Sequence, residues 1–224
     1  MGSSSWKWLV VALVVAGCSK GKSDGPQAPV DQGPPQGPPV EAVLTNAPQV
    51  PPATGPTLPP GSLYQWEGSL KDQRGNTVAW SVGQGRTVLI SMFYSTCPYA
   101  CPMLISSIKH LEKKLSPQAR EQVVVVLVSM DPVRDTPEAN LRMAQAHGVD
   151  PSRWYLLQPD PRDVPEIAAL LGMTYRQNAD GSFGHSMQVT ALAPDGAVIA
   201  KRGTPNDEPA EILAALERSA GSSR

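Results

Sequence analysis

Features that mark several common classes of protein are scarce in this 224-residue sequence. No run of lysine or arginine is longer than two residues, and the formal net charge is −1, with an isoelectric point near 6.3. Nucleic acids and anionic membrane surfaces are bound through clusters of basic side chains, so neither kind of binding is supported. Cysteine and histidine occur only three times each, so any site built from them has few candidate residues.

The chain opens with a short apolar stretch. Residues 8–16 follow Lys7 and give an apolar core of about nine residues. Such a core is too short to cross a hydrocarbon layer of about 30 Å, but it is typical of a secretory signal. It runs into Val15-Ala16-Gly17-Cys18, which resembles a bacterial lipobox. We expect residues 1–18 to be a lipoprotein signal peptide with Cys18 lipidated. An ordinary signal peptide and an uncleaved anchor remain alternatives.

Prolines are concentrated in one segment. About half of the 24 prolines lie between Pro26 and Pro60, among Gly, Gln and Ala and with almost no aromatic residues. Such a composition buries too little apolar surface to offset the entropy lost on ordering. We therefore expect residues 19–60 to form a disordered, semi-extended tether. Residues 61–224 are then enough for one domain with a well-buried core.

The remaining residues alternate between strand and helix patterns. Residues 86–93 and 123–128 are continuous apolar runs rich in β-branched residues, typical of strands buried on both faces. Strand–helix–strand–helix followed by a hairpin and a helix predicts an α/β fold with a central sheet covered on both faces. The other predicted elements are a hairpin within 64–80, helices over 102–115, 136–147, 164–171 and 208–219, and a hairpin over 187–201.

Two cysteines remain once Cys18 is assigned to lipidation. Cys97 and Cys101 follow a buried strand and precede a helix, which is the thioredoxin-like arrangement. Pro102 is tolerated only in a first helical turn, so we expect the helix to begin there, with Cys101 as N-cap. Both sulfurs would then lie near the positive end of a helix, which favours thiolate. Two thiolates suit Cu(I) and tolerate Zn(II). A structural disulfide or an electron-exchanging dithiol remain alternatives.

A third ligand would have to come from the histidines. His110 should point away from the start of its helix, and His147 lies in the last turn of a helix, where capping is expected. His185 stands where the first strand of the final hairpin begins, and we expect this position to face the cysteine loop. Met103 and Met187 could add weak axial sulfur, but we expect both to pack in the core.

Three motifs, taken together, resemble the SCO/SenC copper proteins over residues 63–216. The resemblance implies a thioredoxin-like, three-layer fold with a central mixed sheet flanked by helices and an N-terminal hairpin. It also implies one copper ion per chain, Cu(I) or Cu(II), held by Cys97, Cys101 and His185, with Asp131 near the site and tuning it. The motifs are Phe93-Tyr94-Ser95-Thr96-Cys97-x-x-x-Cys101-Pro102, Ser129-Met130-Asp131-Pro132-Val133-Arg134-Asp135-Thr136-Pro137 and Gly184-His185-Ser186.

The same resemblance implies partners and a location. The protein is expected to be a monomer in the bacterial cell envelope, lipid-anchored, facing the periplasm and binding no nucleic acid. Its client would be cytochrome c oxidase subunit II, whose two-copper centre would receive the copper. As an alternative, Cys97 and Cys101 would act as a redox-active pair, a thiol–disulfide oxidoreductase that reduces the cysteines of that centre.

One residue departs from the family pattern, and one further class shares the fold. Members commonly carry an acidic residue before the ligand histidine, and here it is Gly184, so a carboxylate that could orient the imidazole or meet a partner is missing. A peroxidase of the peroxiredoxin or glutathione-peroxidase type would share the fold. It would leave Cys101-Pro102 and His185 unexplained.

Overall fold

The computed structural model describes residues 58–221 apart from 98, 180, 204–206 and 208. The expected signal peptide, the lipidation site Cys18 and nearly all of the expected tether lie outside the described residues. No helix in the described part is both long and apolar enough to cross a membrane.

A five-stranded mixed sheet forms the centre of the domain, in the order β5-β4-β3-β8-β9. Strands β3 (Thr87–Phe93), β4 (Val123–Ser129) and β5 (Trp154–Leu157) run parallel, whereas β8 (Val189–Leu192) and β9 (Val198–Arg202) are antiparallel to their neighbours. Every residue of β3 and β4 is buried. Their continuous apolar sequence is therefore explained by a sheet covered on both faces.

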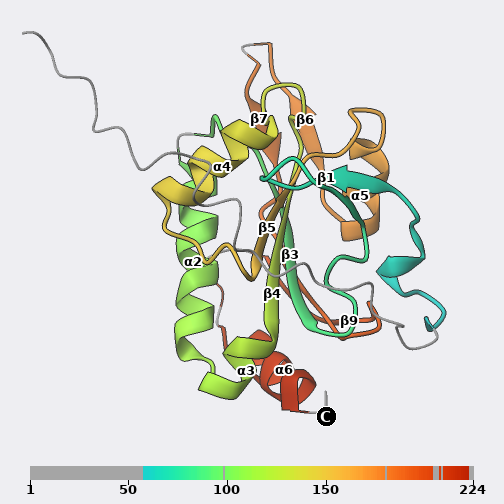
Figure 1. The fold of residues 1–224 in the computed structure, drawn as a ribbon, viewed down its shortest axis with the longest axis vertical. Helices are drawn as coiled ribbons and strands as arrows, with labels where there is room; N and C mark the ends of the chain where they lie inside the picture. The colour runs from blue at the N-terminus through green and yellow to red at the C-terminus, as the bar shows by residue number, and fades with distance from the viewer. Residues whose placement is uncertain (1–57, 98, 180, 204–206, 208, 222–224) are drawn as a thin grey trace, which may run out of the picture. The chain divides into compact units, whose positions relative to one another are not determined.

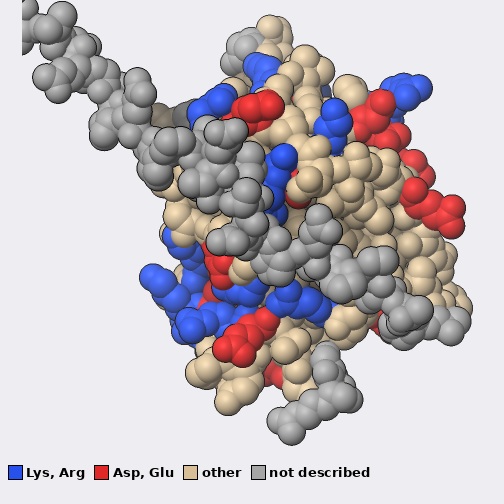
Figure 2. Space-filling model, in the orientation of Figure 1, with Lys and Arg blue, Asp and Glu red and all other residues tan. Residues whose placement is uncertain are grey.

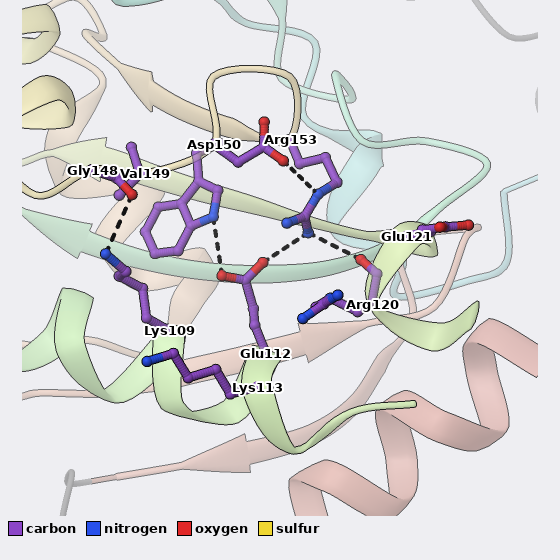
Figure 3. A pocket seen from close by; sticks show the side chains of 10 residues that line it. Lys109, Glu112, Lys113, Arg120, Glu121, Gly148, Val149, Asp150 and Arg153 are labelled. Carbon is purple, nitrogen blue, oxygen red and sulfur yellow. Dashed lines mark hydrogen bonds and ion pairs between the residues drawn. The ribbon is translucent and has the colours of Figure 1, made fainter. Parts of the chain in front are cut away.

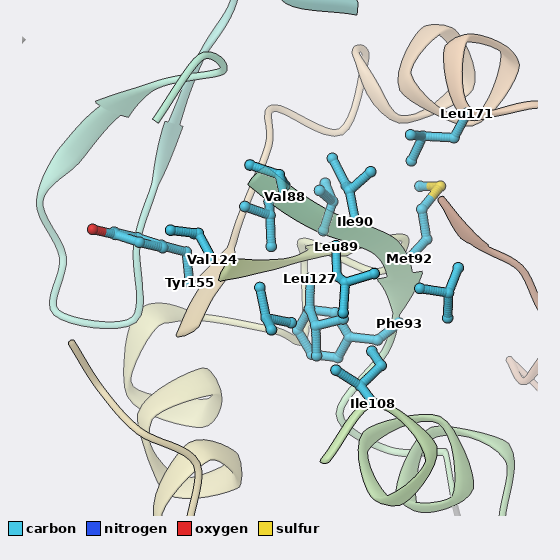
Figure 4. Packing of buried hydrophobic residues seen from close by; sticks show 14 of the residues in the cluster. Val88, Leu89, Ile90, Met92, Phe93, Ile108, Val124, Leu127, Tyr155 and Leu171 are labelled. Atoms are coloured by element: carbon cyan, nitrogen blue, oxygen red, sulfur yellow. The ribbon is translucent and has the colours of Figure 1, made fainter. Parts of the chain in front are cut away.

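Helices cover the two faces of this sheet. Figure 1 shows α2 (Ala100–Lys114) and α5 (Val164–Leu171) on opposite sides of β3 and β4. In Figure 4, Ile108 of α2 and Leu171 of α5 approach β3 from these two sides and enclose Met92 and Phe93. The other helices are α3 (Pro117–Gln122), α4 (Pro137–Ala146) and α6 (Ala210–Gly221). The predicted layered α/β fold is confirmed.

Two small antiparallel sheets accompany the central one, and the first is joined to its β5 edge by a bridge between Lys71 and Gln158. The first pairs β1 (Ser69–Lys71) with β2 (Thr77–Ala79), as predicted, and a short 3-10 helix over Leu63–Gln65 precedes it. The second pairs β6 (Tyr175–Gln177) with β7 (Phe183–His185). The prediction placed His185 at the start of the final hairpin. It lies instead in this separate hairpin, because β8 begins only at Val189.

The start of α2 also differs from the prediction. The helix begins at Ala100 with Tyr99 as N-cap, so Cys101 lies inside the first turn and is not the cap. Pro102 is the third helical residue, and the first four N–H groups of a helix have no partner within it. The missing N–H of proline therefore costs nothing there. Leu104, Ile108 and Leu111 are buried, as the predicted apolar stripe requires.

Candidate metal centre

The two cysteines lie together where β3 leads into α2. The backbone N–H of Cys101 points at the Cys97 sulfur, with an N–Sγ distance of 3.4 Å, and the backbone N–H of Tyr94 lies 3.5 Å from the Cys101 sulfur. Both residues are buried, with 8% of Cys97 and 1% of Cys101 exposed, and both are free thiols. The sequence-predicted sulfur pair is therefore assembled, with Cys97 the more accessible member.

The pKa values of the two thiols are shifted in opposite directions. Burial acts to raise the pKa of Cys97, but hydrogen bonds from the N–H groups of Cys101 and Tyr99, the Tyr94 hydroxyl and the Cys101 thiol outweigh it. The pKa of Cys97 is thus lowered. Burial raises the pKa of Cys101 strongly, and the nearby charge of Cys97 adds to this. The surroundings therefore favour the thiolate at Cys97, which accepts a hydrogen bond from the thiol of Cys101.

Tyr94 connects the cysteines to the hairpin that carries His185. Its hydroxyl is hydrogen-bonded to Cys97. Its ring meets Phe183 with centroids 5.2 Å apart and the imidazole of His185 edge-on at 5.9 Å. The Tyr94 side chain therefore contacts both Cys97 and the imidazole of His185. Sequence analysis gave Tyr94 no role, because a tyrosine after a buried strand is indistinguishable from core.

His185 does not join the two sulfurs in a three-ligand set. Its Nδ1 lies 3.0 Å from the carbonyl oxygen of Ser186. Among residues 58–221 as described, no three His, Cys, Asp or Glu side chains are grouped so that they could hold a metal ion. Ligation by His185 stays a prediction, and it requires the β6–β7 hairpin to bring the imidazole closer to the sulfurs.

The other histidines take the places expected of them. His110 is exposed on α2. His147 is the C-cap of α4, and its carbonyl oxygen accepts a hydrogen bond of 2.6 Å from Lys109. Of the two methionines expected to pack in the core, Met187 is half-buried against it, but Met103 is half-exposed. The prediction was wrong for Met103, because this position lies off the apolar stripe of α2 that Leu104, Ile108 and Leu111 form.

The loop after β4 contributes two buried carboxylates with different partners. Asp131, which was expected near the site, forms an ion pair with Arg134, whose guanidinium also donates to the carbonyl oxygen of Gly181 in the turn between β6 and β7. Asp135 is fully buried and accepts hydrogen bonds from Ser129 and from the backbone N–H of Ser95. Asp135, which the sequence analysis named only as part of a motif, is thus the carboxylate that fastens the cysteine loop.

Burial raises the pKa of Asp135, and the hydrogen bonds from Ser129 and Ser95 offset this only in part. The same carboxylate also contributes to the raised pKa of Cys101. Spacing alone could not reveal this contact, because Asp135 and Ser95 are forty residues apart and meet only through the pairing of β3 with β4.

A second group of charged residues lies at the far end of α2. Figure 2 shows Lys and Arg side chains gathered around acidic ones over α2 and α3, where there is a pocket of about 360 Å³. The carboxylate of Glu112 accepts a hydrogen bond of 2.8 Å from Arg153, a contact drawn in Figure 3, and one of 3.2 Å from the indole N–H of Trp154. Glu112 follows Cys101 by eleven residues, or about 16 Å of helix, so this group is separate from the thiols.

The paired sulfurs fit a soft cation. Two close thiols in a largely buried position, one of them already biased towards thiolate, are the donor set that Cu(I) favours. The same pair, with a lowered pKa at the more accessible thiol and a fully buried partner, also fits thiol–disulfide exchange. The geometry therefore supports soft-metal binding and dithiol redox chemistry at this site.

The fold and the thiol pair define a thioredoxin-like protein of the SCO class. The SCO1/SenC family profile matches residues 61–221, and the chain belongs to that family. The structure of ScoI from Bradyrhizobium japonicum with copper bound is similar, at 23% identity and a TM-score of 0.58, over 69% of this chain and 98% of that one. A SCO1/SenC family lipoprotein from Bacillus anthracis str. Ames is 21% identical with a TM-score of 0.62, over 69% and 94%.

A candidate copper-binding protein of Stutzerimonas stutzeri is 25% identical over 133 residues, which is 58% of this chain. The match spans 64% of the length of that relative. The solved structures establish the likeness in fold, and the predicted thioredoxin-like class is confirmed.

Proposed function

We propose that this protein is a copper metallochaperone that holds one copper ion through Cys97, Cys101 and His185. The observation that carries the proposal is the pair of close, largely buried thiols at the start of α2. Two soft donors fit Cu(I), and a neutral imidazole would complete a three-coordinate set from which the ion can be passed on by ligand exchange. Membership of a family that includes a structure with copper bound supports the same cargo.

The client we propose is cytochrome c oxidase subunit II, at its two-copper centre. Lipidation of Cys18 would hold the domain at the membrane of the cell envelope, facing the periplasm. A tether of about 42 residues would reach roughly 35 Å as a flexible coil, and farther if polyproline-like. Such a reach would let an anchored domain find a client embedded in the same membrane. A lipoprotein among the similar structures supports this location.

A Cu(I) titration of the reduced protein tests the ligand set. One equivalent should bind tightly in competition with a chromophoric Cu(I) chelator. Cys97→Ala, Cys101→Ala and His185→Ala should each lose affinity. His110→Ala is the matched control, because His110 is an exposed histidine of the same domain. Full affinity in the His185 variant would exclude it as a ligand, and full affinity in both cysteine variants would refute the site.

The acidity difference between the thiols favours a second candidate function, a thiol–disulfide oxidoreductase. The Cys97 thiolate would attack a client disulfide to form a mixed disulfide, and Cys101 would then displace the client thiol. Two electrons and two protons would pass to the client, which leaves as a dithiol while Cys97 and Cys101 become a disulfide. His185→Ala discriminates the two functions, since it should leave this exchange nearly unchanged and reduce copper affinity.

A further inference from the structure

Arg134 joins two parts of the chain that both belong to the candidate metal centre. Its Nε donates to the carboxylate of Asp131, in the loop after β4, and its Nη2 donates to the carbonyl oxygen of Gly181, in the turn of the β6–β7 hairpin. Gly181 has φ +79°, and a Cβ there would lie 3.3 Å from the Arg134 guanidinium. The guanidinium therefore lies directly against the turn.

The hairpin that carries His185 depends on such side-chain contacts for its position. It is a two-stranded sheet of its own, with Tyr175 opposite His185, and it shares no ladder with the five-stranded sheet. Most of β6 is exposed, and a lone two-stranded hairpin is marginal in water. Contacts that fix it to the domain are the packing of Tyr175 and Phe183 against the core, the ring of Tyr94 against Phe183 and His185, and the hydrogen bond of Arg134 to the turn.

The loop that holds Arg134 is itself fixed to the cysteine loop. Asp131 is buried, and its backbone N–H donates to Ser129 at 2.9 Å. Four residues later, Asp135 accepts from the backbone N–H of Ser95, two residues before Cys97. One short loop therefore contacts the cysteine side of the site through Asp135 and the histidine side through Arg134.

We infer that Arg134 is a positioning residue for His185: anchored on Asp131, it fixes the turn of the β6–β7 hairpin and keeps the imidazole where it can close onto Cys97 and Cys101. The inference rests on the proposed copper function. Arginine suits the role because its planar fork reaches two oxygen acceptors in one fixed geometry, which a lysine ammonium cannot do in the same way. Without Arg134 the hairpin samples more positions, and fewer of them place the imidazole near the sulfurs.

The test compares Arg134→Gln, Arg134→Lys and Asp131→Asn in the full-length protein. Arg162→Gln is the matched control, because Arg162 also pairs with an aspartate, Asp160, but on the surface. In the metal-free protein, amide hydrogen exchange of residues 181–187 should quicken by about tenfold in Arg134→Gln and Asp131→Asn, with β3 and β4 unchanged. Arg134→Lys should give a smaller change, and the control none.

Copper affinity gives a second, independent measurement. Cu(I) affinity should fall by about 10- to 100-fold in Arg134→Gln, the range found when residues that orient metal ligands are removed. The double variant Arg134→Gln with His185→Ala should bind no more weakly than His185→Ala alone, since Arg134 acts only through that ligand. If Arg134 merely stabilised the fold, Arg134→Gln would lower Cu(I) affinity by the same factor in wild type and in His185→Ala.

The outcomes distinguish the positioning role of Arg134 from the proposed copper function. If wild type binds copper through His185 but Arg134→Gln matches wild type in hairpin exchange and in affinity, the positioning role is refuted while the proposed function stands. An additive loss in the double variant would also overturn it. If wild type and His185→Ala bind copper equally, the proposed ligand set fails, and the role of Arg134 fails with it.

Discussion

The carboxylate of Asp135 accepts a hydrogen bond from the backbone N–H of Ser95, with an N–Oδ1 distance of 2.9 Å. The hydroxyl groups of Ser95 and Ser129 donate to the same carboxylate, so it is well satisfied although it is fully buried. This relationship fastens the loop after β4 beneath the cysteine loop. Removing the carboxylate should therefore affect the stability of the domain and the order of the thiols together.

The first prediction concerns the stability contributed by Asp135. Asp135→Ala should lower the free energy of unfolding by about 3 kcal/mol, because buried donors of Ser95 and Ser129 lose a charged acceptor. Urea denaturation followed by circular dichroism measures this. Exposed Glu67→Ala is the control and should stay within about 0.5 kcal/mol of wild type. Equal effects of the two substitutions would show that the buried hydrogen bonds do not matter.

The second prediction is a dependence of stability on pH. Burial raises the pKa of Asp135 in the folded protein, and the hydrogen bonds from Ser129 and Ser95 lower it only in part, while Asp131 raises it. A raised folded pKa means that the contribution of the group is fully present below its unfolded pKa, about 3.9, and is lost as pH rises through the folded value. Wild type should therefore lose stability relative to Asp135→Asn as pH rises from 3 to 8.

Urea midpoints of the two proteins over that range measure the difference, and the comparison cancels titration elsewhere in the chain. If the urea midpoint of wild type instead rose relative to that of Asp135→Asn as pH rises, the predicted direction of the pH dependence would be wrong.

The third prediction concerns the reactivity of the two thiols in the reduced, metal-free protein. Iodoacetamide should modify Cys97 at least about tenfold faster than Cys101, because Cys97 is more exposed and one pKa unit changes the thiolate fraction tenfold. Tyr94→Phe removes one hydrogen bond to the Cys97 sulfur and should slow its modification about fivefold at pH 7. Peptide mass spectrometry reports both rates. Faster labelling of Cys101 would contradict the prediction that Cys97 is the more reactive thiol.

Local sequence was enough for the elements whose pattern is long and continuous. The apolar runs of β3 and β4, the Thr136-Pro137 start of α4 and the glycine after α5 each determine structure within a few residues, and all were predicted. Strand β5 was missed, because four apolar residues carry too little periodicity. Helix α3 was missed because a proline just after the predicted helix over 102–115 is typical of a helix end, yet Pro117 is also a favourable first residue for a new helix.

For the candidate site, the sequence predicted the residues of the motifs but not the tertiary contacts that position them. Cys97 and Cys101 are neighbours in the sequence, so their pairing follows from spacing. The position of His185 depends on how β6 and β7 pair and on contacts with Tyr94 and Arg134, all of which are tertiary. Asp135 and Arg134 were each visible in the sequence as charged residues of a loop. Their partners, Ser95 and Gly181, could be found only from the folded structure.

The fourth prediction separates the stability of the far end of α2 from the chemistry of the thiols. Glu112 has a side chain only 9% exposed, and its carboxylate accepts from Arg153 and from the indole of Trp154. Glu112→Ala should lower the free energy of unfolding by about 2 kcal/mol, because it removes one of the two carboxylates that pair with Arg153, the other being Asp150, and leaves the buried indole N–H of Trp154 without its acceptor. Asp160→Ala removes the partner of Arg162 at the surface, where solvent screens the pair, and its urea midpoint should stay close to that of wild type.

The same two variants should leave the site itself unchanged. Glu112 is about three turns of helix from Cys101, and neither Glu112 nor Asp160 contacts the loops that hold the thiols or His185. Cu(I) affinity and the labelling rate of Cys97, measured well below the urea midpoint of each variant, should therefore match wild type within about twofold. A large loss of copper affinity in Glu112→Ala alone would mean that the charged cluster sets the position of α2, and with it the distance between the two sulfurs.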